Sequence, residues 1–346
     1  GITGSNGKTT TSKMLYNIIN NSDKNVMLGG NIGIPFSENV LMELKNNITN
    51  LFNVVEVSSF QLEDIVKFSP HISCLLNISE DHLDRYNNDL IEYAKTKFKI
   101  IQNFCDKKSM FIFNHDDPII KDLIKTYSFK SFYPFSKKEK YNKSFYIESN
   151  CIFYDKKKFK LDLSNLKIPG EHNYLNVLAT LIICDLINVN LDIAKKTLIE
   201  FQSIPHRLEY VCKYKEINFY NDSKATNISS TIAAVKSFSN DIILILGGID
   251  KSATNFQTSL KKYFSKIRVI LCYGQSGKTI YDQLSSSIKD IYIDKKFDDM
   301  LDRMKLIICN NDNVILSPGC TSFDQFKSFE ERGNYYKKYI HKNFTT

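Results

Sequence analysis

Short apolar runs alternate with helical patterns along most of the chain. In the first half, the apolar runs that indicate strands lie at 54–57, 72–78 and 110–114. Helical patterns lie at about 14–19, at 90–104 and at 174–187. The second half repeats this rhythm, with apolar runs at 242–246, 269–273, 291–293 and 314–316. Near-continuous apolar strands separated by helices are typical of a parallel sheet that helices cover on both faces, so the pattern predicts an α/β fold.

The same pattern indicates two domains. A chain of 346 residues has room for roughly two domains of ordinary size. A helical pattern ends at a proline near 203–205, which predicts domains at 1–203 and 204–346. Within the first domain a more polar stretch, at about 130–168, is expected to form a small antiparallel addition.

Composition narrows the class of protein. Hydrophobic residues make up 42% and charged residues 24% of the chain, which is typical of a globular protein. The net charge is +8, but lysines are spread throughout and no basic face dominates, so we expect no nucleic-acid partner. No apolar run approaches the roughly 20 residues of a membrane span, so we expect no membrane partner. The eight cysteines include no C-x-x-C pair and indicate a reducing, cytoplasmic setting.

The opening segment, GITGSNGKTT, carries the strongest chemical signal. Its glycines let successive backbone N–H groups turn toward an anion, and a following helix adds its positive N-terminal end. Lys8 can place its ammonium on terminal phosphates, and the Thr9 hydroxyl can bind Mg²⁺. The segment therefore predicts a nucleotide phosphate loop that includes Gly4, Asn6, Gly7, Lys8, Thr9 and Thr10.

The position of this loop in the chain is unusual. Gly1 and Gly7 are further apart than the glycines of the common G-x-x-x-x-G-K motif, so this is a longer variant. A phosphate loop normally follows a buried strand, whereas the chain begins on the first glycine of the loop. We therefore expect that strand, and an N-terminal part of the protein before it, to be missing.

Two further polar side chains lie in or just after predicted strands. Glu56 lies in the run 54–57, where an acid is costly unless it binds a cation or a donor, which makes it a candidate Mg²⁺ ligand. His82 lies in the polar segment 77–86, at a strand end where open α/β sheets place their ligands. On spacing alone, a buried acid satisfied by the backbone is an equal alternative for Glu56. For His82 the alternative is a surface loop of mixed charge.

Lys97 interrupts the apolar stripe of a predicted helix. At about 100° per residue, Leu90, Ala94 and Ile101 fall on one narrow stripe. Lys97 lies in the middle of that stripe, whereas the neighbouring lysines point to the opposite side. A lysine in this position either extends to the edge of the interface or has a function in which it is neutral, paired or chemically modified.

Polar clusters in the second half adjoin the predicted strands. They lie at 205–209, 220–227, 247–251 and 317–322. In a parallel sheet, such segments project from one edge, so together they would make a second concave face. Any single cluster is more often a loop than a site, but a set at equivalent strand ends favours a binding site.

Taken together, these segments resemble the Mur ligase family, ATP-dependent amide-forming enzymes of bacterial cell-wall synthesis. The resemblance runs in order from the first residue almost to the last. It is carried by GITGSNGKTT, GGNIGIP at 29–35, EVSSFQLE at 56–63, SEDHLDRY at 79–86, GEHNYLN at 170–176, IPHRLE at 204–209, NDSKATN at 221–227, GGIDKSA at 247–253 and SPGCTSFDQFKSFEERG at 317–333. Ser5 and Gly319 replace the more usual Thr and Ala, and both changes are sterically mild.

The resemblance implies an architecture and a reaction. The chain would hold a P-loop-type central ATPase domain with a mostly parallel sheet, followed by a Rossmann-like C-terminal domain that binds the amino acid. An N-terminal UDP-binding domain would be the missing part, so we expect this chain to bind Mg-ATP but to ligate slowly. The segments are most like those of members that add D-glutamate to UDP-N-acetylmuramoyl-L-alanine through an acyl phosphate. ATP and Mg²⁺ would be the cofactors, and we expect a monomer.

Carried over position by position, the resemblance also implies roles for site residues. The catalytic residues would be Lys8, His82 and Lys97, with Lys97 carbamylated. Mg²⁺ would be held by Thr9, Glu56, His82 and the carbamate of Lys97. The phosphate loop would bind ATP together with Asn176, Arg207 and Asp222. The UDP-sugar substrate would contact Asn31, Ser58 and His82, and the amino acid would contact Lys224, Thr226, Lys251, Ser322 and Phe329.

Two alternatives stay open. The first is a sister enzyme, either another Mur-type ligase that adds a different amino acid or a folylpolyglutamate synthase. The second is a regulatory module that binds nucleotide without catalysis, which would leave the inward Lys97 unexplained.

Overall fold

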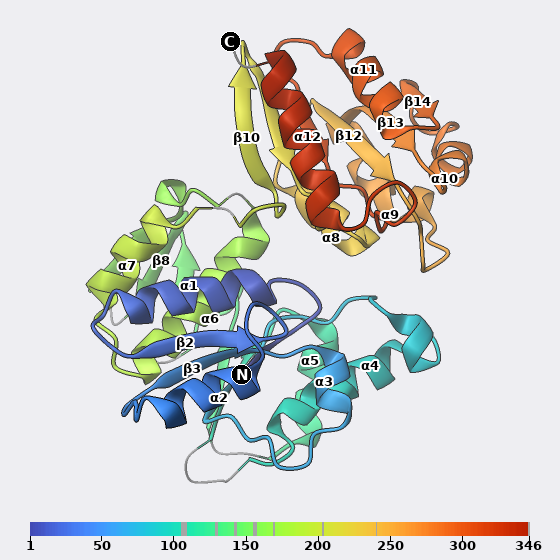
Figure 1. Cartoon of the computed structure of the whole chain (residues 1–346). Coiled ribbons are helices and arrows are strands. Elements are labelled where there is room, and N and C mark those ends of the chain that lie inside the picture. The colour runs from blue at the N-terminus through green and yellow to red at the C-terminus, as the bar shows by residue number, and fades with distance from the viewer. Residues whose placement is uncertain are drawn as a thin grey trace. The chain divides into compact units, whose positions relative to one another are not determined.

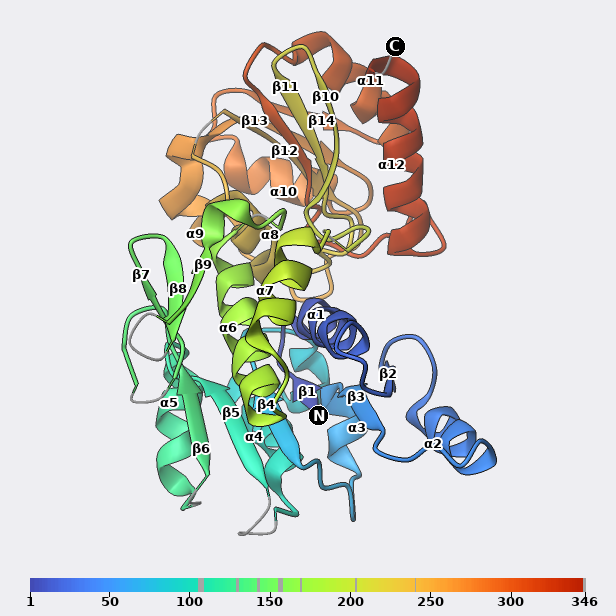
Figure 2. The ribbon, with the colours of Figure 1, turned by 90° about the vertical axis from the view of Figure 1, so that its left-hand side faces the viewer.

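The computed structural model in Figures 1 and 2 describes residues 1–104, 109–128, 131–141, 144–154, 158–168, 170–202, 204–239 and 241–344. It divides into two compact units, Gly1–Gln202 and Ser203–Thr346. Each unit is built on its own sheet and has its own core.

The first unit is built on a six-stranded sheet in which every neighbouring pair is parallel. This is the sheet that the apolar runs predict. In spatial order its strands are β2 (Val26–Gly30), β3 (Phe52–Glu56), β1 (Ile2–Thr3), β4 (Ile72–Leu75), β5 (Met110–Asn114) and β6 (Phe132–Phe135).

Helices cover both faces of this sheet (Figure 2). One layer consists of α1 (Lys8–Asn20), α6 (Glu171–Leu186) and α7 (Leu191–Glu200), and the other of α3 (Ser59–Glu63), α4 (Leu90–Phe98) and α5 (Pro118–Leu123). Phe111 and Phe113 of β5 pack with residues of α4 and α5, while Ile112 between them is equally buried. Successive strand residues point to opposite faces, so the uninterrupted apolar run reflects burial on both sides. The shorter elements are α2 (Phe36–Lys45), η1 (Leu83–Tyr86), η2 (Lys99–Ile101), η3 (Ile124–Thr126) and η4 (Leu163–Asn165).

The expectation that the strand before the phosphate loop is missing is wrong. Ile2 and Thr3 form β1, which lies in the centre of the sheet between β3 and β4. The amino group of Gly1 donates a 2.8 Å hydrogen bond to the carbonyl oxygen of Ile72. The apolar pattern of β1 is weak because the strand is only two residues long and lies inside the glycine-rich segment that the motif assigns to the loop.

The polar stretch 130–168 has two parts. Residues 132–135 form β6 and belong to the main sheet, which the sequence did not predict. The predicted antiparallel addition is present as β7 (Tyr146–Glu148), β8 (Cys151–Tyr154) and β9 (Phe159–Asp162). Residues 130, 142–143 and 155–157 of this stretch lie outside the described residues.

The second unit also has a six-stranded sheet. Its strands are, in spatial order, β10 (Glu209–Tyr214), β11 (Ile217–Asn221), β15 (Asn313–Leu316), β12 (Ile242–Gly247), β13 (Ile267–Tyr273) and β14 (Ile291–Asp294). Only the edge strand β10 pairs antiparallel, through a hairpin with β11; the other pairs in this described sheet are parallel. The mixed polar and apolar sequence of this hairpin gave no clear strand pattern.

Two apolar layers enclose this sheet. On one face pack α8 (Ile228–Lys236), α9 (Phe256–Leu260) and α10 (Gly277–Leu284), and on the other α11 (Phe297–Ile307) and α12 (Phe329–Phe344). The short helix η5 (Lys261–Lys266) follows α9. Strand β12 contributes Leu244 and Leu246 to the first layer and Ile243 and Ile245 to the second. The arrangement is the α/β class that the sequence predicts.

The strands of the second unit end together at one edge of the sheet. Leu316 at the end of β15 is level with Asn221 at the end of β11 and with Ile245 near the end of β12. Because β10 is antiparallel, its first residue, Glu209, also lies beside Asn221. The four predicted polar clusters therefore adjoin a single edge.

Candidate active site

The phosphate loop crosses from β1 to the N-terminus of α1. Gly7 has φ 86° and caps α1, and a Cβ atom built on it would lie 2.4 Å from Oδ1 of Asn176. Only glycine fits so close an approach, and that approach brings Asn176 of α6 to the loop. Within the described residues, the first turn of α1, which holds Thr9 and Thr10, has no side-chain cap and no acid. Its N–H groups and positive dipole end are thus suited to an anion.

A clamp from the loop after β4 holds this segment in shape. Oδ1 of Asn77 accepts a 2.8 Å bond from the N–H of Asn6, and its amide donates a 3.0 Å bond to the Asn6 carbonyl. Oγ of Ser5 donates to the Ser79 carbonyl and accepts from the Ser79 N–H, both at 2.9 Å. Asn77 and Ser79 were not singled out as site residues. The polar segment 77–86 held the only signal for them.

Two lysines meet at the loop. Nζ of Lys8 donates to the carbonyl oxygens of Gly4 at 2.7 Å and Ser5 at 2.8 Å. Nζ of Lys97 donates to the same Gly4 oxygen at 3.0 Å and lies 4.6 Å from the centre of the Tyr93 ring. Lys97 is 1% exposed, as its place in the apolar stripe predicts.

The surroundings of Lys97 oppose its positive charge. Burial, and to a smaller extent the charge of Lys8, place the pKa of Lys97 well below the ordinary lysine value, although Asp81 and Glu56 act in the opposite direction. A larger fraction of this amine is therefore neutral than in an ordinary lysine.

Glu56 ends β3 beside the loop that contains Asn31. The side-chain amide of Asn31 donates a 2.9 Å bond to Oε1 of Glu56, and the Asn31 N–H donates 2.8 Å to the Glu56 carbonyl oxygen. Glu56 is 1% exposed, and its Oε2 has no hydrogen-bond partner among the described residues. A buried carboxylate oxygen without a donor fits a hard cation such as Mg²⁺.

The chemistry of the described donors also suits Mg²⁺ better than a tightly caged metal. Among the described residues, no group of three or more His, Cys, Asp or Glu side chains is placed to hold a metal ion. Mg²⁺ commonly takes one or two carboxylates and fills its other positions with water and phosphate oxygens. Glu56 and Thr9 fit such a site.

Ser58 and His82 contact neighbouring residues, and these contacts are structural in kind. Ser58 caps α3 through a reciprocal capping box with Gln61. The His82 ring packs against Phe60, with 4.9 Å between ring centres, and its Nε2 lies 3.7 Å from a carboxylate oxygen of Asp81. The His82 side chain is 51% exposed and available to a ligand.

In the second unit, Asp222 is the buried acid of the sheet edge. Its Oδ1 accepts a 2.9 Å bond from the N–H of Leu208, and its Oδ2 accepts a 2.8 Å bond from Oγ of Ser317. Burial raises the pKa of Asp222 to about 7, although these bonds and the nearby charges of Arg207 and Arg332 lower it. The partly buried Arg207 follows the left-handed residue His206 at the start of this edge.

The residues predicted to bind an amino acid lie on the segments around this edge. Nζ of Lys224 lies 3.9 Å from the centre of the Phe329 ring, and the N–H of Thr226 donates 2.9 Å to the Lys224 carbonyl. Ser322 is buried, whereas Lys251 is exposed and its Nζ lies 5.4 Å from the centre of the Phe323 ring. Both lysines thus rest on aromatic rings.

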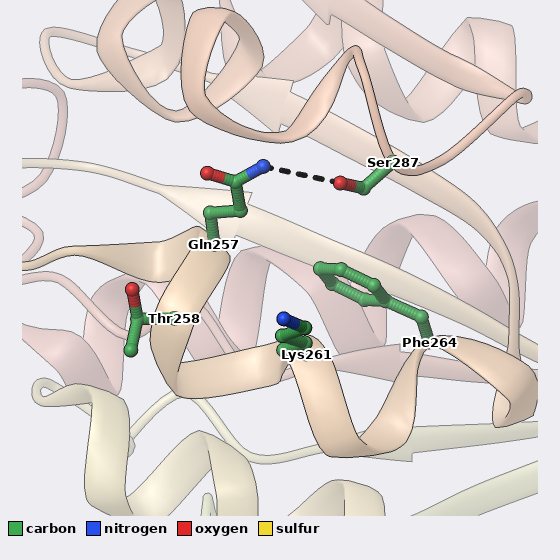
Figure 3. A pocket seen from close by; sticks show the side chains of 5 residues that line it. All are labelled: Gln257, Thr258, Lys261, Phe264 and Ser287. Carbon is green, nitrogen blue, oxygen red and sulfur yellow. Dashed lines mark hydrogen bonds between the residues drawn. The ribbon is translucent and has the colours of Figure 1, made fainter.

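The second unit also has a hollow with a different lining. It has a volume of about 460 Å³ and is lined by Gln257, Thr258, Lys261, Phe264 and Ser287. Figure 3 shows the hydrogen bond, 3.2 Å long, that joins Gln257 to Ser287 across it. None of the predicted site residues lines this hollow.

Comparison with protein families gives two matches. Residues 2–184 match the family described as Mur ligase middle domain. Residues 206–320 match the family described as Mur ligase, glutamate ligase domain. Among the described residues, no helix is long and apolar enough to cross a membrane.

Curated relatives match almost the whole chain. It is 35% identical over 342 residues to the UDP-N-acetylmuramoylalanine–D-glutamate ligase of Caldanaerobacter subterraneus subsp. tengcongensis. This match covers 98% of this chain and 74% of that protein. The protein of the same name from Bacteroides fragilis is 35% identical over 343 residues, with 98% of this chain and 76% of that protein covered.

Solved structures support the fold. The MurF ligase of Thermotoga maritima in complex with ADP has a TM-score of 0.70 at 17% identity, covering 99% of this chain and 80% of that chain. The UDP-N-acetylmuramate-alanine ligase of the same organism has a TM-score of 0.65 at 21% identity, covering 99% of this chain and 75% of that chain.

Proposed function

Because the chain belongs to the Mur ligase family, we propose that it joins D-glutamate to UDP-N-acetylmuramoyl-L-alanine with consumption of ATP. The observation that carries this proposal is the extent of the match: relatives named for that reaction cover 98% of this chain at 35% identity. The likeness supports D-glutamate over the amino acids of sister ligases. It also supports a role in making the peptidoglycan precursor.

The proposed reaction has two steps. A carboxylate oxygen of the alanine residue attacks the γ-phosphorus of ATP, the bond from that phosphorus to the bridging oxygen breaks, and ADP leaves. The D-glutamate amine then attacks the carbonyl carbon of the acyl phosphate. The tetrahedral intermediate loses phosphate, the amine loses a proton, and an amide remains. Both steps bring anions together, so positioning and charge neutralisation are the main tasks of the protein.

The phosphate loop has the groups for the first step. The N–H groups at the start of α1 would bind an anion without competition from a side-chain cap among the described residues. Lys8 would exchange its bonds to the Gly4 and Ser5 carbonyls for bonds to phosphate oxygens. Asn176, which lies against Gly7, would contact the nucleotide from α6. Arg207 and Asp222 of the second unit are the proposed nucleotide contacts there.

Lys97 would act as a carbamate. Its neutral amine can combine with carbon dioxide, forming an N–C bond and releasing one proton, and the product is an anion. The lowered pKa and the buried position beside the loop support this reading. Thr9, Glu56, His82 and the Lys97 carbamate are the groups that would hold Mg²⁺, which when bound offsets charge on the phosphate oxygens.

The substrates would meet other described segments. Asn31, Ser58 and His82 are the proposed contacts to the UDP-sugar. Lys224, Thr226, Lys251, Ser322 and Phe329 would bind D-glutamate, and the two lysines supply charges that match a dicarboxylate. We also propose that the enzyme is a cytoplasmic monomer without nucleic-acid or membrane partners.

An amino-acid panel tests this function against its alternatives. ADP release is measured with UDP-N-acetylmuramoyl-L-alanine and, in turn, D-glutamate, L-glutamate, D-alanine and L-lysine. Release that depends on D-glutamate supports the proposal. Release that depends on another amino acid indicates a sister ligase, and ATP binding without any amine-dependent release indicates a non-catalytic nucleotide-binding module.

A further inference from the structure

We propose that Arg332 is a positioning residue for the amino-acid site, and that its buried charge favours a substrate with two carboxylates. This inference rests on the proposed function above. Arg332 lies on α12 directly after Glu330 and Glu331, and side chains of these charged types are mostly exposed in proteins. In the structure it is 0% exposed and among the largest fully buried side chains.

The guanidinium is satisfied by neutral oxygen atoms. Nε donates to Oγ of Ser223 at 2.9 Å, and Nη2 donates to the Ser223 carbonyl at 2.8 Å and the Cys320 carbonyl at 3.2 Å. Nη1 donates to the Tyr273 hydroxyl at 3.0 Å. Among the described residues, no carboxylate forms an ion pair with Arg332. Arginine is seldom buried without such a partner. Its charge acts at longer range on the Asp222 carboxyl, whose pKa it lowers, but within the described residues no hydrogen-bonded carboxylate neutralises it.

The bonds of this one side chain join the segments proposed to bind the amino acid. Ser223 directly precedes Lys224, and Cys320 lies two positions before Ser322. Oγ of Ser223, which accepts from Arg332, donates in turn to the Phe329 carbonyl at 2.8 Å. Arg332 thus fixes the backbone beneath three of the five proposed contacts.

The loop that carries Lys251 packs on the same group. A Cβ atom added to Gly248 would lie 3.2 Å from Nη1 of Arg332 and 2.0 Å from the Thr321 carbonyl oxygen. The N–H of Ile249 also donates a 2.9 Å bond to that Thr321 oxygen. The guanidinium therefore lies where the ends of β11, β12, β13 and β15 meet.

The chemistry of arginine suits both parts of this role. Its rigid fork can hold several acceptors in fixed directions, which a lysine ammonium cannot do. Its charge is permanent and is screened little in a buried position, so it raises the potential of the site above it. An anionic amino-acid side chain would compensate that charge, whereas its uncharged amide analogue would not.

The test compares Arg332→Met, which removes the charge and the fork, with Arg332→Lys, which keeps only the charge. Arg268→Met is the matched control. Arg268 lies in the same unit, and this substitution removes its ion pair with Asp312 without touching the site segments. For each protein, KM is measured for D-glutamate and for ATP, together with the kcat/KM ratio of D-glutamate to D-glutamine. Thermal unfolding reports the fold.

For Arg332→Met we expect KM for D-glutamate to rise about 10-fold or more, and the D-glutamate to D-glutamine ratio to fall by a similar factor. KM for ATP should stay within about 3-fold, because no hydrogen bond of Arg332 goes to a proposed nucleotide contact. Arg332→Lys should raise KM for D-glutamate but keep the ratio. Arg268→Met should lower thermal stability without changing KM for D-glutamate or the D-glutamate to D-glutamine ratio.

Ser223→Ala keeps the guanidinium and its bond to the Ser223 carbonyl, but removes the hydroxyl that accepts from Nε of Arg332 and donates to the Phe329 carbonyl. We expect it to fold and to raise KM for D-glutamate about 3-fold or more. Arginine variants that fold and match the control would overturn the proposal. Failure of both to fold, with KM unchanged in Ser223→Ala, would overturn it as well. Wild-type protein without D-glutamate-dependent ADP release would reject the proposed function instead.

Discussion

Nζ of Lys97 donates a 3.0 Å hydrogen bond to the carbonyl oxygen of Gly4, which lies 93 residues earlier in the chain. Helix α4 thus brings a buried amine to the phosphate loop. Lys95 of the same helix lies on the opposite, solvent-exposed face. Burial of an unpaired lysine opposes folding, because the amine must lose its proton or its hydration. The proposed function of Lys97 at the loop would account for its presence there.

Replacing Lys97 by Ala should therefore remove activity. We expect the ligation rate to fall by about 100-fold or more, because the variant cannot form the carbamate proposed to hold Mg²⁺. The free energy of unfolding should change little or rise, since a buried amine is removed. ADP release and thermal unfolding are the measurements, and Lys95→Ala on the exposed face of the same helix is the control.

Chemical rescue distinguishes a carbamate from an amine. Formate or acetate can occupy the space left in Lys97→Ala and supply a carboxylate, so each should restore part of the rate. Methylamine should not. Full activity of the variant without any additive, or rescue by methylamine alone, would show that no carbamate acts at this position.

Gly7→Ala should disrupt nucleotide binding. The new Cβ atom would lie 2.4 Å from Oδ1 of Asn176, so that the loop or α6 must move. We expect ATP affinity to fall by about 10-fold or more and stability by more than about 1 kcal/mol. Gly33→Ala is the matched control, since Gly33 also has positive φ, 65°, but its Cβ would meet nothing within 4 Å. Equal effects of both substitutions on ATP affinity would contradict the proposed contact between α6 and the loop.

Lys251→Ala should weaken the use of D-glutamate. Loss of a charge-assisted contact to a carboxylate costs on the order of 2–3 kcal/mol, which corresponds to about 30- to 150-fold in KM. KM for ATP should be nearly unchanged, because Lys251 follows β12 and lies outside the phosphate loop. The exposed Lys262 on η5 provides the control variant Lys262→Ala. A raised KM for ATP with an unchanged KM for D-glutamate would refute the assignment.

Asp222 should make stability depend on pH. Burial raises its pKa from 3.8 to about 7, so the native state holds the proton more tightly than the unfolded state. The stabilisation that protonation provides is present below the unfolded pKa and is lost as pH rises through about 7. Between pH 4 and 7, the unfolding free energy of the wild type should therefore fall relative to Asp222→Asn, by at most about 4 kcal/mol. Denaturant titrations at several pH values measure this difference, and parallel pH profiles would contradict it.

Periodicity and motifs predicted a good part of this architecture. The inward direction of Lys97 follows from helical spacing alone, and the parallel sheets follow from apolar runs bounded by polar strand ends. Strands β2, β10 and β11 were missed because their sequences mix polar and apolar residues or contain glycine, and their strand state depends on pairing with neighbours.

Contacts between distant segments were beyond sequence reasoning. Asn77 recognises the backbone of Asn6, and nothing in an asparagine at position 77 specifies a partner 71 residues away. Arg332 follows two glutamates and belongs to a residue type that is mostly exposed, yet it is fully buried and bonded to segments that come together at the sheet edge. Such side chains are identified by the acceptors that surround them, which only the tertiary fold brings together.

The most direct test of the central claim is ADP release by the protein expressed from its complete gene. The assay contains Mg-ATP and UDP-N-acetylmuramoyl-L-alanine, with and without D-glutamate. The account predicts steady release only when both substrates are present, with one mole of amide product per mole of ADP. Release that is independent of D-glutamate, or that is sustained equally well by another amino acid, would contradict it.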